Sequence, residues 1–176
     1  MRASLVITLL LFVCLPCCAQ RRQEPLSDQE VEQLRDNAML PDKRITAFQK
    51  IIDARIDRIQ DLAGKKYEAG RVEDLHDWMQ QVADITGELE ENLETYEQDH
   101  RDLRKVLPKL IAATERWKSV LNQPEKNETY EIVRQFAVDS VADVQKEATE
   151  LLPKQKEYFK QHPPRKEGER GIEVER

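Results

Sequence analysis

The residues with the best spacing for chemistry are two Glu-x-x-His pairs, Glu73 with His76 and Glu97 with His100. Residues three apart lie on one face of a helix, and di-iron bundle proteins hold a metal ion with this pair. Such a site needs the pair on two different helices and a Glu from each of two more. Here both pairs fall on one predicted helical series, about 36 Å apart at 1.5 Å per residue. Glu73 is predicted to face solvent and His100 to lie near a helix end or turn, so we predict no metal site.

The sequence offers no other combination of residues suited to catalysis. Beyond residue 19 the serines are Ser27, Ser119 and Ser140, in capping or helical positions without a neighbouring His to activate the hydroxyl. The sequence has no Gly-rich phosphate loop, and acidic runs such as Glu88-Leu-Glu-Glu are typical of a solvated helix face. The sequence therefore predicts a protein that is not an enzyme, with no catalytic, cofactor-binding or metal-ligating residues.

The first 19 residues have the three parts of a secretory signal peptide. Arg2 supplies the positive charge, Leu5 to Val13 form an apolar run, and small residues lead to a cleavage position after Ala19. The run is too short for a membrane-spanning helix, which needs about 20 apolar residues. We expect residues 1–19 to be removed and the protein to be exported, either to the periplasm or out of the cell.

All three cysteines, Cys14, Cys17 and Cys18, lie in this segment. Cleavage after Ala19 leaves a domain without disulfides, which must be held together by its core. An alternative is an outer-membrane lipoprotein anchored through Cys17 or Cys18. Bacterial lipoproteins usually carry Gly or Ala before the modified Cys, whereas here the preceding residue is Pro16 or Cys17.

The composition is acidic and highly charged, with a net charge of -6 and 35% charged residues. The basic pairs Lys65-Lys66 and Arg165-Lys166 stand alone, so the sequence offers no basic patch for a phosphate backbone or an anionic membrane. Low glycine content with abundant charge favours a helix-rich chain. Nucleic acid is therefore excluded as a partner, and a protein partner is expected.

Helix signals follow one another along the rest of the chain. Ser27 and Glu30 have the spacing of a capping box, and Pro41 suits the first turn of a helix that runs to Ala63. A last helix begins near Asn127 and should be kinked or ended by Pro153. The larger aromatic residues lie on the apolar stripes and are predicted to pack in the core: Phe48, Trp78, Tyr96, Trp117, Tyr130 and Phe136.

Between Val72 and Leu121 the apolar residues follow a heptad repeat. Twelve of the fifteen core positions are apolar or aromatic. An unbroken repeat would form one helix of about 50 residues, roughly 75 Å long. However, the apolar face narrows from Glu94 to Asp102, and Pro108 suits a helix start. We therefore predict a break between Gln98 and Asp102.

These segments predict an all-α protein whose residues 20–162 form an antiparallel helical bundle of about four main helices and a short N-terminal helix. The alternative is an elongated three-helix coiled coil. Residues 163–176 are charged and almost without hydrophobic side chains, so we expect a disordered tail.

The function predicted from these features is that of an exported, non-enzymatic structural or interaction protein of the cell envelope. It would bind another protein through a helical face. A periplasmic holdase-type chaperone is the alternative, since the chain is small, helical and highly charged. A metal-dependent enzyme built on the Glu-x-x-His pairs is the third and least favoured hypothesis.

Overall fold

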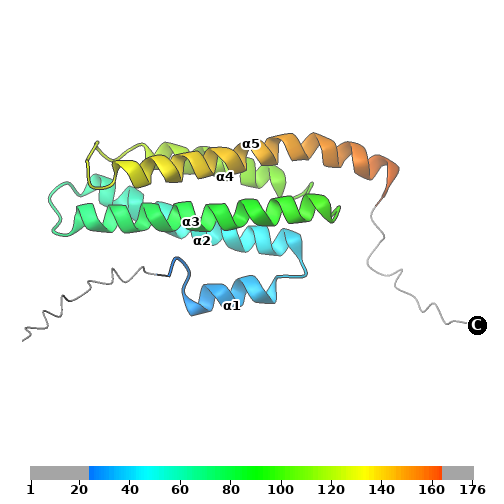
Figure 1. Ribbon diagram of the computed structural model, residues 1–176, viewed down its shortest axis with the longest axis horizontal. Coiled ribbons are helices and arrows are strands. Elements are labelled where there is room, and N and C mark those ends of the chain that lie inside the picture. The colour runs from blue at the N-terminus through cyan, green and yellow to red at the C-terminus, as the bar shows by residue number, and fades with distance from the viewer. Residues whose placement is uncertain (1–23, 164–176) are drawn as a thin grey trace, which may run out of the picture.

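The computed structural model describes residues 24–163, which form five α helices and no strand. The helices are α1 (Asp28–Asp36), α2 (Pro41–Gly64), α3 (Arg71–Gln98), α4 (Leu107–Leu121) and α5 (Glu131–Gln161) (Figure 1). The predicted all-α fold is therefore confirmed. The predicted signal peptide at 1–19, with Cys14, Cys17 and Cys18, lies outside the described residues, as does the predicted tail after Pro163.

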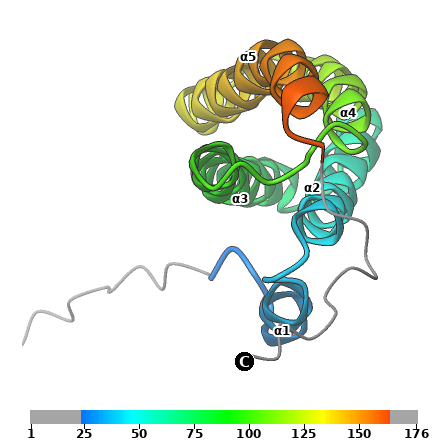
Figure 2. The same cartoon turned by 90° about the vertical axis from the view of Figure 1, so that its right-hand side faces the viewer.

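Helices α2 to α5 form a four-helix bundle in which α2 and α5 occupy opposite corners. Each of these two packs against both α3 and α4, and α1 lies outside the bundle against α2 (Figure 2). Each helix runs antiparallel to the one before it, so the neighbours α3 and α5 run in the same direction (Figure 1). Within residues 24–163, every helix is too short or too polar to span a bilayer.

The heptad repeat correctly predicted the core of α3 and α4. All fifteen positions are buried except Val72, which is partly exposed, and His100. Four of the six aromatic residues predicted in the core are buried there, namely Phe48, Tyr96, Trp117 and Tyr130, and Trp78 packs partly buried against it.

Phe136 is the exception, because its side chain is 61% exposed. The buried stripe of α5 passes instead through Val133, Ala137 and Val141, at spacings of four. Residue 136 is one position before Ala137 and is therefore rotated by about 100° from that stripe. The prediction that Phe136 is a core residue was wrong.

The predicted break between Gln98 and Asp102 is confirmed, and a single helix from Val72 to Leu121 is excluded. Helix α3 ends at Gln98, and Pro108 occupies the first turn of α4, where its missing amide proton costs nothing. Between them His100 has φ 52°, a left-handed conformation that reverses the chain and is uncommon for a residue with a side chain.

Helix α5 does not end at Pro153 but continues to Gln161. Pro153 itself is exposed, while Leu151, Gln155 and Phe159 are buried on the opposite side. Burial of this second half compensates for the hydrogen bond that proline cannot make.

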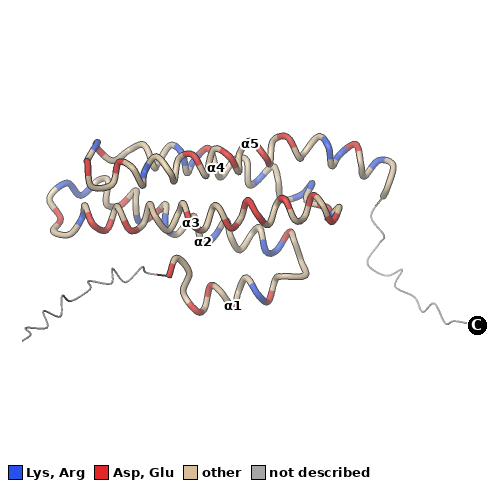
Figure 3. Tube along the Cα trace, in the orientation of Figure 1, with Lys and Arg blue, Asp and Glu red and all other residues tan. Residues whose placement is uncertain are grey.

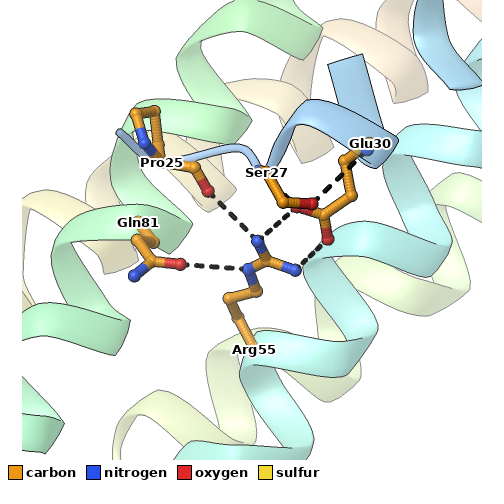
Figure 4. Close-up of polar contacts among 5 residues, drawn as sticks. All are labelled: Pro25, Ser27, Glu30, Arg55 and Gln81. Carbon is orange, nitrogen blue, oxygen red and sulfur yellow. Dashed lines mark hydrogen bonds and ion pairs between the residues drawn. The ribbon is translucent and has the colours of Figure 1, made fainter. Parts of the chain in front are cut away.

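A polar network around Arg55 joins helix α1 to the bundle (Figure 4), and Leu34 of α1 is buried in the core. The capping box is confirmed: the Ser27 amide donates to Glu30 Oε2 at 2.9 Å, and the Glu30 amide donates to Ser27 Oγ at 3.4 Å. Arg55 of α2 pairs with the Glu30 carboxylate and donates to the Pro25 carbonyl and to Gln81 Oε1 of α3, each at 3.1 Å. Burial raises the pKa of Glu30, but the hydrogen bonds from Arg55 and Ser27 outweigh it and lower that pKa.

Candidate functional site

The candidate site begins with a hollow of about 250 Å³ where α5 passes the end of α3. Its most buried members come from one face of α5, at spacings of four: Leu151, Gln155 and Phe159. His100 and Tyr158 stand at its more exposed side, and Glu97 and Lys154 complete the lining. We call this the aromatic hollow.

Three stacked rings lie beside the aromatic hollow. The His100 ring packs on the Tyr158 ring with a centroid distance of 4.5 Å and an angle of 20° between the planes. Tyr158 also stacks with His162 at 4.4 Å. The left-handed backbone at His100 is what turns the chain at this position, so the break between α3 and α4 builds one side of the hollow.

Gln155 holds that break in place. Its Nε2 donates to the Arg101 carbonyl at 2.8 Å, and its Oε1 accepts from the Leu103 amide at 2.7 Å. The side chain is 5% exposed, so these two bonds satisfy backbone groups that lie outside any helix. One amide thereby ties α5 to the connection that carries His100.

A second hollow, of about 230 Å³, follows α3 and α5 next to the first. Acidic residues recur along both helices (Figure 3). Six carboxylates and two lysines line it: Glu90, Glu94, Glu97, Asp143, Glu147 and Glu150, with Lys146 and Lys154. We call this the acidic groove. It shares Glu97 and Lys154 with the aromatic hollow.

Glu147 is the carboxylate of the acidic groove whose ionised form is most disfavoured. Its Oε1 is buried and has no hydrogen-bond partner among the described residues. Burial, followed by the nearby carboxylates Glu90, Glu94 and Glu97, raises the pKa of Glu147 to about 7, with Lys154 opposing the rise. Burial and then Asp143 also raise the pKa of Glu90. The groove therefore holds more negative charge than its own lysines neutralise.

The structure does not bring the two Glu-x-x-His pairs together. Glu73 is exposed near the start of α3, and His76 Nδ1 lies 3.0 Å from Asp77 Oδ1. Glu97 and His100 line the aromatic hollow at the other end of that helix. In the described part of the chain, no group of three or more His, Cys, Asp or Glu side chains is placed to hold a metal ion.

Four residues of the aromatic hollow were missed from the sequence: Lys154, Gln155, Tyr158 and Phe159. The last helix was expected to be kinked or ended at Pro153, although the buried spacing of Ala148, Leu151, Gln155 and Phe159 continues beyond it. That spacing was the available signal.

The lining residues suit binding better than bond-making chemistry. Neither hollow is lined by a Ser or Cys next to a base, while aromatic rings and unneutralised carboxylates lie side by side. Such a surface can hold an apolar group next to a cation. Comparison of the chain with protein-family models, curated proteins and solved structures finds no match.

Proposed function

We propose that the chain is an exported, non-enzymatic interaction protein of the cell envelope that binds another protein through the face formed by α3 and α5. The observation that carries the proposal is the union of the aromatic hollow and the acidic groove, which share Glu97 and Lys154. Export rests on the signal-like sequence of residues 1–19.

Folding does not account for this face. A bundle needs its apolar stripe buried, which the core already achieves, and it gains nothing from six carboxylates set along one groove. Burial, and then like charges nearby, raise the pKa of Glu147, so ionisation of this carboxylate opposes folding. A strongly perturbed pKa at a concave surface is typical of a binding site.

Recovery of partners tests the proposal. The full-length chain is expressed with an affinity tag in its source organism, and proteins retained from an envelope extract are identified beside those retained by the Tyr158→Ala variant. We expect one protein in near-stoichiometric yield that the variant fails to retain. Retention of no protein above the level of the empty resin, by a chain shown to be helical, contradicts the function.

A holdase chaperone is the second candidate, favoured by one exposed apolar pair. Ile132 and Phe136 lie one turn apart near the start of α5 and are 69% and 61% exposed. A holdase would use such a pair to contact unfolded clients. The test is suppression of client aggregation at an equimolar ratio, compared with Ile132→Ser/Phe136→Ser. Absence of suppression by the unaltered chain excludes this function.

A further inference from the structure

Building on the proposed function, we infer that the aromatic hollow and the acidic groove together dock an extended basic segment of a partner protein. A large apolar side chain of that segment enters the aromatic hollow, and flanking Lys or Arg side chains lie along the acidic groove.

The aromatic hollow favours an apolar side chain in the bound segment. Leu151 is 1% exposed and Phe159 8% exposed, so an entering side chain meets residues that are otherwise part of the protein interior. The Tyr158 ring is stacked between His100 and His162, so its edge and the His100 ring border the hollow beside them. A purely ionic ligand such as a metal ion or a polyamine would leave this surface unused.

Charge complementarity favours basic side chains of the partner along the acidic groove. The acidic groove opposes six carboxylates to two lysines, and one of these, Lys154, is already paired with Glu97 at 3.1 Å. Cationic side chains from a partner would compensate the remaining carboxylates, including the half-buried Glu147. The same groove repels acidic segments, nucleic acid and anionic lipid, because like charges brought together weaken association.

The dimensions favour an extended segment. The lining residues of α5 run from Asp143 to Phe159, which is about 24 Å along a helix at 1.5 Å per residue. An extended chain covers this distance with about seven residues at roughly 3.3 Å each. A single short stretch of a partner can therefore reach both hollows at once.

The test uses a fluorescent peptide of about seven residues, with a central Phe and a Lys-Ser-Lys arm on either side, so that either chain direction fits. The fluorescence anisotropy of the peptide is measured as the chain is added, at about 0.05 M salt. We expect saturable binding that weakens about tenfold when the probe's Phe is replaced by Ala. Binding should disappear when each Lys of the probe is replaced by Glu.

Variants of the chain locate the contact. Glu94→Gln/Glu150→Gln should weaken binding about fivefold at low salt and have little effect at about 0.5 M salt. His100→Asn removes the imidazole but tolerates the left-handed backbone, and should weaken binding about threefold without loss of helicity. The exposed-site controls Glu115→Gln and Phe136→Ala should bind as the unaltered chain does.

Absence of saturable binding overturns the inference. Equal binding of the Phe and Ala probes does so too, because it would reduce the contact to cation attraction alone. Loss of binding in the control variants, equal to that in the site variants, also overturns it. A partner recovered from the envelope and retained equally by Tyr158→Ala would refute this site. It would leave an interaction protein that binds its partner elsewhere. Binding of the probe with no partner recovered would support this site and contradict the proposed function.

Discussion

Lys154 of α5 and Glu97 of α3 form an ion pair at 3.1 Å between an aromatic hollow and an acidic groove. Both residues line both hollows, and the Lys154 side chain is 61% exposed. An exposed pair of this kind contributes little to stability, about 0–1 kcal/mol. Its position matters more than its strength, because Lys154 is one of only two cations that line the groove.

Replacing that lysine separates binding from stability. Lys154→Gln should strengthen binding of a basic peptide by about threefold at low salt, because it removes a competing cation, while stability changes by less than about 1 kcal/mol. Peptide anisotropy and urea denaturation measure the two effects. Lys156→Gln, an exposed position on the same helix, is the control. Weaker binding by Lys154→Gln would place the contact elsewhere.

Glu147 should make the fold less stable as the solution becomes alkaline. Its pKa is raised from 4.5 to about 7 in the folded protein, so folding binds a proton between these values. The stabilisation is full below about pH 4.5 and is lost as the pH rises to 7.

Glu147→Gln should remove this dependence and stabilise the protein at pH 8 by about 1–2 kcal/mol, after allowance for solvent screening. Urea midpoints at pH 5, 6, 7 and 8 test the expectation, with the exposed Glu115→Gln as the matched control. Parallel pH profiles for Glu147→Gln and the unaltered chain would show that the carboxylate is ionised throughout this range.

Gln155 should be the most sensitive polar residue of the site. Gln155→Leu leaves the Leu103 amide and the Arg101 carbonyl without their partner, which should cost about 2–4 kcal/mol. Denaturation measures the loss, and faster hydrogen exchange at the Leu103 amide locates it. Lys156→Leu serves as the exposed neighbour. An unchanged Leu103 exchange rate would mean that the amide of Gln155 does not hold this connection.

Replacing Arg55 should loosen the attachment of α1 and leave the other helices unchanged. Arg55→Met removes the pair with Glu30 and the bonds to Pro25 and Gln81, and α1 packs on no other helix as extensively as on α2. We expect amide exchange within α1 to rise about tenfold or more while exchange in α3 and α5 stays unchanged. Arg58→Met, at an exposed position of the same helix, is the control. Equal acceleration throughout the bundle would contradict this local role.

The sequence predicted those parts of the fold that depend on local periodicity. The heptad repeat identified the buried residues of α3 and α4, and the narrow apolar face after Glu94 with Pro108 located the break. Phe136 was misplaced because it lies one position away from the stripe of Val133, Ala137 and Val141 that the bundle buries. The extension of α5 past Pro153 depends on burial against other helices, which outweighs a local helix-breaking preference.

The candidate site could not be predicted in the same way. It depends on α3 and α5 being neighbours, and periodicity does not say which faces meet. Glu97 and His100 were considered as a metal-binding pair and rejected, and no other role was predicted for them. The structure sets them beside Lys154 and Tyr158, from a segment more than 50 residues away. Long-range pairing of this kind is decided by packing of the whole bundle.

Chemical-shift mapping locates the peptide contact on the chain residue by residue. The isotopically labelled chain is titrated with the basic peptide that carries a central Phe, and each amide signal is followed. We expect the largest shifts to cluster in two stretches, from Glu90 to His100 and from Asp143 to Phe159, with little change in α1 or α2. Shifts centred on Ile132 and Phe136, or spread evenly over the chain, would contradict it.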